Sequence, residues 1–85
     1  MREISKDEVS LHCKKEDLWI IFEDKVCDLT DYYSSHPGGA ALLKYAGKDA
    51  TLAIQLLTAH NLARHFIDKK LQECCIGTVK KRNFL

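Results

Sequence analysis

The segment His36-Pro37-Gly38-Gly39 places a histidine on a rigid turn beside apolar residues, and this limits what the chain can build around it. Proline fixes its own φ and biases the preceding residue toward an extended conformation. The glycines can adopt backbone angles closed to other residues, and they let a flat ligand come close. A histidine held in this way, without a neighbouring acid or nucleophile, suits metal ligation better than acid–base catalysis. The alternative is an ordinary Pro-Gly turn between two helices that carries an incidental histidine.

A second histidine follows at a spacing that suits a shared site. His60 lies 24 positions after His36, beyond the apolar run Ala50 to Leu57, which favours a helix. Haem iron held by two axial imidazoles needs histidines on opposite walls of one crevice. Two short helices joined by a turn can supply that arrangement. His36 and His60 are therefore a candidate pair of iron ligands.

The first half of the chain predicts short helices around a hairpin. Ser5 to Glu8 has the form of a capping box, and Glu23-Asp24 separates two strand-like runs. The expected elements are a helix from Ser5 to about His12, a buried strand from Leu18 to Phe22, its partner from Lys25 to Asp28, and a helix capped by Thr30 or Asp31 that ends before His36.

The second half predicts three more helices and a returning strand. Gly47 is a favoured residue just past a helix end, and Asp49 can cap the next helix. The expected elements are helices from Ala40 to Ala46, from Ala50 to Leu57 and from Asn61 onward with an apolar face of Leu62, Phe66, Ile67 and Leu71, and a strand from Ile76 to Val79. The fold class is α+β, with a small sheet under at least four short helices.

Several motifs occur in an order typical of one known family. They are Asp17-Leu18-Trp19-Ile20-Ile21, Lys25-Val26-Cys27-Asp28-Leu29-Thr30, His36-Pro37-Gly38-Gly39, Ala46-Gly47-Lys48-Asp49-Ala50-Thr51, His60, and Ile76-Gly77-Thr78-Val79. With these motifs the chain resembles cytochrome b5 over nearly its whole length, residues 1–85 forming one domain. The resemblance implies a cytochrome b5-like fold, a small mixed sheet whose short helices form a haem crevice.

The resemblance implies a one-electron carrier rather than an enzyme, with haem b held by His36 and His60. The chain has no Cys-x-x-Cys-His element, so we expect the haem to be bound non-covalently. The implied partners are a flavin-dependent reductase of the cytochrome b5 reductase type and a redox acceptor protein. With both axial positions filled, oxygen and substrates find no open coordination position, which favours electron transfer.

Further residues close to the two histidines are candidates for the haem pocket. They are Tyr32, Gly38, Leu42, Leu43, Ile54, Leu57 and Asn61. For the apolar members the alternative is generic hydrophobic core, and Trp19 and Ile20 are expected in a core beneath the pocket. Asn61 could hydrogen-bond a haem propionate, as the residue after the family's second ligand often does, or it could cap the following helix.

The chain departs from the family pattern in its ligand region. Tyr33 stands where an aliphatic residue is usual, and the segment from Asp49 to His60 is one residue longer. His65 therefore competes with His60 for the second ligand position. We prefer His60 because it follows the apolar run directly at a helix-to-helix turn, whereas His65 falls inside the next helix.

The expected rim of the haem crevice also differs. Ala40-Ala41 stand where relatives often place glutamates. Nearby in sequence are four basic residues, Lys44, Arg64, Lys69 and Lys70. Relatives use an acidic rim to steer basic partners, so a neutral or acidic partner surface fits this chain better.

The size and charge of the chain argue against several classes of protein. Eighty-five residues make one small domain, which profits from a bound group at its centre. A net charge of +1 argues against nucleic-acid binding, and no run of about 18 apolar residues could serve as a membrane anchor. The first residues lack a signal-peptide core. We expect a cytoplasmic monomer whose four cysteines are small buried residues, although their even number also permits disulfides.

Two other functions compete with an independent carrier. A non-redox module that binds haem or a sterol is known among relatives, although those relatives tend to lack the paired histidines. The same domain also occurs inside larger oxidoreductases, such as desaturases, hydroxylases and reductase fusions.

Overall fold

A computed structural model describes residues 2–35, 40–58 and 64–81 of the chain. Within these ranges five strands form one mixed sheet in the order β1-β5-β4-β3-β2. Strand β1 runs parallel to β5, and the other neighbours are antiparallel. The strands are β1 Glu3–Ile4, β2 Cys13–Lys14, β3 Asp17–Phe22, β4 Lys25–Asp28 and β5 Cys75–Val79.

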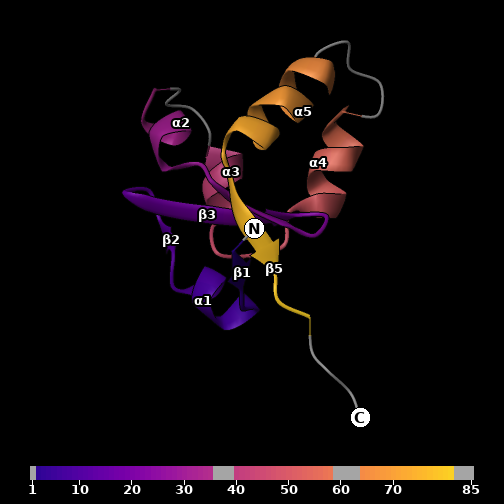
Figure 1. The fold of residues 1–85 in the computed structure, drawn as a ribbon. Helices are drawn as coiled ribbons and strands as arrows, with labels where there is room; N and C mark the ends of the chain where they lie inside the picture. Colours follow the sequence, from indigo (N-terminus) through magenta and orange to yellow (C-terminus); the bar gives the residue numbers. More distant parts are fainter. Residues whose placement is uncertain (1, 36–39, 59–63, 82–85) are drawn as a thin grey trace.

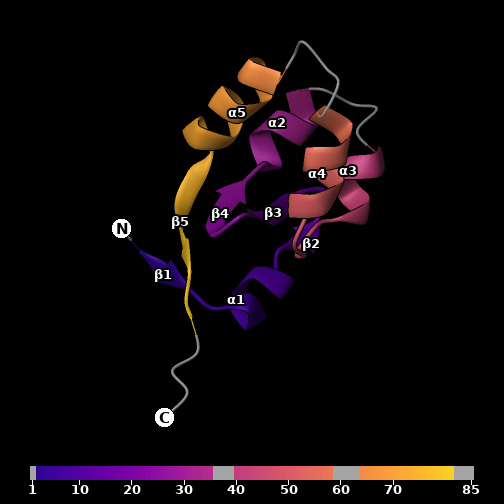
Figure 2. The same ribbon diagram turned by 90° about the vertical axis from the view of Figure 1, so that its right-hand side faces the viewer.

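The helices lie on both sides of this sheet, as Figure 1 and Figure 2 show. Helix α1 covers one side, and helices α2 to α5 cover the other. The helices are α1 Lys6–Ser10, α2 Thr30–Ser35, α3 Ala40–Lys44, α4 Thr51–Thr58 and α5 Arg64–Glu73. The expected α+β arrangement, a small mixed sheet with several short helices, is confirmed.

Strand β3 is buried on both of its faces. Leu18 and Ile20 are fully buried on the side of helices α2 to α5. Trp19 and Ile21, which point to the opposite face, are 8% and 3% exposed. Successive side chains of a strand alternate between faces, so an unbroken apolar run requires a core on each side. The run Leu18 to Phe22 is therefore explained by its central position in the fold.

The buried side chains form two hydrophobic clusters, one on each face of the sheet. The helix-side cluster consists of Leu18, Ile20, Cys27, Leu29, Ala46, Ala50 and Leu71. The α1-side cluster consists of Ile4, Val9, Trp19, Ile21 and Val26. Ile20 thus lies beneath helices α2 to α5 as expected, whereas Trp19 belongs to the core on the other face of the sheet.

Local signals account for several element ends. The Ser5 hydroxyl accepts a hydrogen bond of 3.1 Å from the Glu8 backbone N–H, which confirms the cap of α1. Gly47 has a φ of +75°, a left-handed value that glycine adopts readily, and it follows α3 closely. The Asp49 carboxylate accepts a hydrogen bond of 2.9 Å from the Thr51 N–H at the start of α4.

The predicted apolar face of the last helix is only partly correct. Leu71 is 8% exposed and Ile67 packs partly buried against the helix-side cluster. Phe66, by contrast, is 62% exposed. One residue along a helix turns the side chain by about 100°, so Phe66 cannot share the face that Ile67 and Leu71 present to the core. Leu62 lies outside the described residues.

The four cysteines are free thiols with different surroundings. The expectation of buried residues is confirmed for Cys27 and wrong for Cys13, which is exposed, while Cys74 and Cys75 are half-buried. Burial raises the pKa of Cys27 to about 12, with smaller contributions from Cys75 and Cys74. Cys27 therefore stays protonated near neutral pH and is a poor nucleophile.

The burial of β3 predicts a large and local effect of truncating its side chains. Leu18→Ala should lower the free energy of unfolding by about 2–5 kcal/mol, because it removes a fully buried side chain and leaves a cavity. Leu11→Ala is the matched control, since Leu11 is 72% exposed and should cost less than about 0.5 kcal/mol. Urea unfolding followed by circular dichroism measures both. Equal losses would contradict this account of the core.

Candidate functional site

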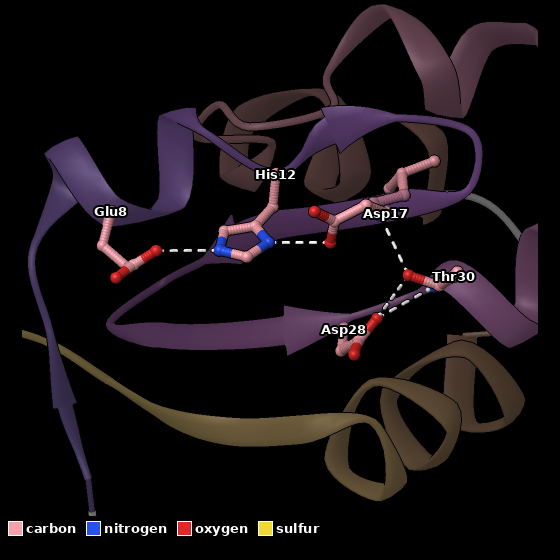
Figure 3. Close-up of polar contacts among 6 residues, drawn as sticks. Glu8, His12, Asp17, Asp28 and Thr30 are labelled. Atoms are coloured by element: carbon pink, nitrogen blue, oxygen red, sulfur yellow. Dashed lines mark hydrogen bonds and ion pairs between the residues drawn. The ribbon is translucent and has the colours of Figure 1, made fainter.

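The start of α2 is fixed against β3 and β4 by a small polar network (Figure 3). The Leu18 N–H donates to the Thr30 hydroxyl oxygen at 2.9 Å. The Thr30 hydroxyl and backbone N–H both donate to the Asp28 carboxylate, at 2.7 and 3.1 Å. Thr30 is therefore the first residue of α2 and Asp28 supplies the cap. This network sets the direction of α2, which ends at Ser35, immediately before His36.

The connection between α3 and α4 is attached to the other edge of β3. The Gly47 N–H donates to the Trp19 carbonyl at 2.6 Å, and the Ile21 N–H donates to the Lys48 carbonyl at 2.9 Å. The Ala50 N–H donates to the Ile21 carbonyl at 2.8 Å. Residues 47–50 thus run alongside β3 like a short extra strand. They place the start of α4 on the same side of the sheet as α2 and α3.

Helices α2 to α5 each contribute apolar side chains to one wall. Tyr32 of α2, Leu42 of α3, Ile54 of α4 and Ile67 of α5 all pack partly buried against the helix-side cluster. Helices α2 and α5 also approach each other, because the Lys70 ammonium lies 5.8 Å from the centre of the Tyr32 ring. Each of these side chains has one part in the core and another part that an apolar ligand could cover.

The candidate site residues divide into described and undescribed ones. Of the pocket candidates, Tyr32, Leu42 and Ile54 belong to the wall above, and Leu43 on α3 is 36% exposed. Four further candidates lie outside the described residues, namely His36, Gly38, His60 and Asn61. For Leu57, the backbone is described as part of α4 but the side chain is not. The competing histidine His65 is an exposed residue of α5.

The charges on these helices are sparse. Neither α3 nor α4 contains an acidic residue, and Lys44 is the one charged residue in the sequence of these two helices. Helix α5 carries both signs, and its Lys70 ammonium lies 3.7 Å from the Glu73 carboxylate. Among the described residues of α3 and α4, an acidic rim is therefore absent.

His12 forms a separate polar cluster with Glu8 and Asp17 (Figure 3), on the face of the sheet where the α1-side cluster lies. Its Nδ1 lies 2.7 Å from the Asp17 carboxylate and its Nε2 lies 2.8 Å from the Glu8 carboxylate. The ring stacks on Trp19 with centroids 3.5 Å apart and planes 8° from parallel. Only the protonated imidazolium can donate from both nitrogens at once. Burial lowers the pKa of His12, but the bonds to Asp17 and Glu8 and their charges outweigh it, so the pKa is raised above 6.5.

In the sequence, His12 marks only the approximate end of the first expected helix, and this cluster is missed. The four-residue spacing of Glu8 and His12 is a usable signal, because it favours contact where the chain is helical. The stacking on Trp19 depends on how β2 pairs with β3, which the sequence does not indicate. His12 stabilises the fold beneath the sheet, on the far side from the wall of α2 to α5.

A match to a protein-family model shows which family the chain belongs to. Residues 5–80 match the model of the cytochrome b5-like heme/steroid binding domain. The chain belongs to this family. The resemblance to cytochrome b5 is thereby confirmed. The wall of α2 to α5 fits a largely apolar group, because its aromatic and aliphatic side chains are only partly buried by the protein itself.

Individual relatives agree with this assignment to the cytochrome b5 family. A cytochrome b5 of Rhizopus stolonifer is 41% identical over 68 residues, which are 79% of this chain and 52% of that protein. An NADH-cytochrome b5 reductase-like protein of Emericella nidulans is 45% identical over 53 residues, 61% of this chain and 12% of that protein. The solved structure of the cytochrome b5 of Ostreococcus tauri virus 2 matches with a TM-score of 0.73 and 40% identity, over 91% of this chain and 95% of that one. The cytochrome b5 fold is confirmed.

Many relatives of this cytochrome b5-like chain are longer than the region that they share with it. The chain spans about half the length, or less, of the curated relatives it matches. Within the residues that the structure covers, no helix has both the length and the apolar character needed to cross a bilayer.

The His12 cluster predicts a pH-dependent contribution to the stability of this cytochrome b5-like domain. The folded state holds the proton on His12 more tightly than the unfolded chain does, since the pKa is raised. The resulting stabilisation is complete below the unfolded-state pKa of 6.5 and is lost as pH rises through the folded-state pKa. The parent should therefore lose more stability than His12→Gln between about pH 6 and pH 9. Urea unfolding at several pH values measures this, and a pH-independent difference between the two proteins contradicts it.

Proposed function

We propose that this chain is a one-electron carrier that binds haem b non-covalently between helices α2 and α3 on one side and α4 and α5 on the other. One observation carries the proposal: Tyr32, Leu42, Ile54 and Ile67, one from each of these helices, pack on one cluster and leave part of their surface for a ligand. Family membership supports the choice of haem as that ligand.

His36 and His60 are the proposed iron ligands. When bound, haem supplies an iron that changes between two oxidation states. Each imidazole would ligate through one nitrogen, and a hydrogen bond to the other nitrogen would set its tautomer. If His36 and His60 both bind the iron, small molecules would have no coordination position, which would favour electron transfer. The position of His36 directly after α2 supports this role, because α2 is held on β3 by Thr30.

The other pocket candidates have simpler roles in this proposal. Tyr32, Leu42, Leu43, Ile54 and Leu57 would cover the faces of the porphyrin and keep water away from it. Gly38 would let the backbone come close to the ring, and Asn61 would hydrogen-bond a propionate or cap the next helix. The expected cytoplasmic location, the monomeric state and the single domain over residues 1–85 stay predictions.

The proposed electron donor is a flavin-dependent reductase of the cytochrome b5 reductase type, and the proposed acceptor is a redox protein. The relative from Emericella nidulans supports a reductase as the donor, because it is named an NADH-cytochrome b5 reductase-like protein. The same relative favours a second candidate function, an electron-transfer domain within a larger oxidoreductase, since the matching region covers 12% of its length. The mass of the native protein distinguishes a separate carrier from such a domain.

A non-redox haem or steroid module is the remaining alternative, in keeping with the name of the family model. Electron flow separates it from a carrier. A carrier loaded with haem is reduced by NADH and a cytochrome b5 reductase and then reoxidised by an acceptor. A binding module with full haem loading shows slow reduction or none.

The ligand assignment predicts different spectra for three single histidine variants. The parent loaded with hemin should show a low-spin spectrum in both oxidation states, because both axial positions are filled by imidazoles. His36→Ala and His60→Ala should each lose the six-coordinate signature, whereas His65→Ala, the matched control on α5, should keep it. Absorption spectroscopy measures this. If His65→Ala and not His60→Ala abolishes the signature, the second ligand is His65.

A further inference from the structure

Helix α4 carries two leucines on its solvent side. Leu52 and Leu56 are each 69% exposed, and they stand one helical turn apart on the same face. The sequence of α4 contains no charged residue at all. Exposed helix faces of small proteins usually carry charged or polar side chains, so this face is unusual.

The core does not need these two leucines. Ile54 packs against the helix-side cluster, and Ala50, just before α4, is 2% exposed within it. Two residues along a helix turn a side chain by roughly 200°, so Leu52 and Leu56 each point away from the face of Ile54. The leucines therefore contribute little to burial in the folded chain, and they leave an apolar surface on the outer face of α4, one of the helices proposed to frame the haem crevice.

The size and charge of this surface indicate what covers it. Two leucine side chains amount to a patch of at most a few hundred Å², well below the roughly 800 Å² per partner that a stable dimer buries. Complexes of electron-transfer proteins are weak and lie at the small end of the interface range. Because α4 has no charge, the complementary surface is neutral and apolar. A short-lived complex with a redox protein matches both properties.

We propose that Leu52 and Leu56 form a docking surface for a neutral, apolar patch on the electron-transfer partner of this protein. This inference rests on the proposed carrier function. Docking at this surface places the partner against the wall helix α4, whose Ile54 faces the helix-side cluster. It replaces the steering by opposite charges that an acidic rim would provide.

The test uses the haem-loaded full chain, with NADH and a cytochrome b5 reductase as the probe partner. Leu52→Glu/Leu56→Glu should lower the second-order rate of haem reduction at least about tenfold, because a desolvated charge opposes apolar contact. Leu52→Lys/Leu56→Lys should lower it to a similar extent. Leu11→Glu is the matched control, since Leu11 is 72% exposed but follows α1 on the other side of the sheet. The parent rate should change less than about twofold between low and physiological salt.

Every outcome of this experiment has a clear meaning. Haem spectra, reduction by dithionite and the reduction potential should be the same in all variants, which ties a rate loss to docking. Unchanged rates in both leucine variants overturn the docking surface and leave the carrier function standing. A faster lysine variant with a slower glutamate variant also overturns it, because charge then decides. A parent that takes up no haem or is not reduced overturns the carrier function itself and, with it, this inference.

Two other occupants of the leucine surface are tested on the same proteins. Sedimentation of the parent and of Leu52→Glu/Leu56→Glu detects a dimer through this face. Flotation with phosphatidylcholine vesicles detects a lipid surface. A leucine-dependent dimer or leucine-dependent vesicle binding overturns the proposal in favour of that occupant.

Discussion

The saturation of both edges of β3 is the constraint on which the rest of this structure depends. On one edge β3 pairs with β4, and that edge continues through the bond from the Leu29 N–H to the Leu18 carbonyl. On the other edge β2 and then residues 47–50 accept and donate the remaining hydrogen bonds. A strand buried on both faces has to satisfy its backbone polar groups within the protein. The same bonds attach the start of α2 to one edge of β3 and the start of α4 to its other edge, so the burial of the strand and the geometry of the site have one cause.

Helices α2 and α4 of the candidate site are hydrogen-bonded to β3 where they begin, but the apolar side chains that the site helices place on the helix-side cluster are only partly buried. Tyr32, Leu42, Ile54 and Ile67 contact the helix-side cluster yet are only partly covered by it. In a chain of 85 residues this leaves little apolar surface to hold the helix pairs together without a ligand. A bound apolar group would therefore act as part of the core, and its binding would stabilise the folded state by mass action.

The sequence predicts those elements whose cause is local. A few neighbouring residues are enough to predict the cap at Ser5, the helix end before Gly47 and the buried strand from Leu18 to Phe22. Strands β1 and β2 are missed because two residues are too short for an alternating pattern. The exposure of Phe66 and Cys13 and the stacking of His12 on Trp19 depend on how the helices and strands pack against one another, which no local pattern indicates. For the site, family motifs supply the candidate ligands, whereas the convergence of α2 to α5 becomes visible only in three dimensions.

The parallel pairing of β1 with β5 has a consequence for how such a domain can be combined with others. Glu3 lies opposite Thr78 and Ile4 opposite Val79, so the first and last strands run side by side at one border of the sheet. Because the two strands are parallel, linkers attached before β1 and after β5 would leave the same border of the sheet in opposite directions. Neither would cross the helices that frame the proposed crevice. A fold of this kind can therefore carry a further segment at either end without obstructing the proposed crevice.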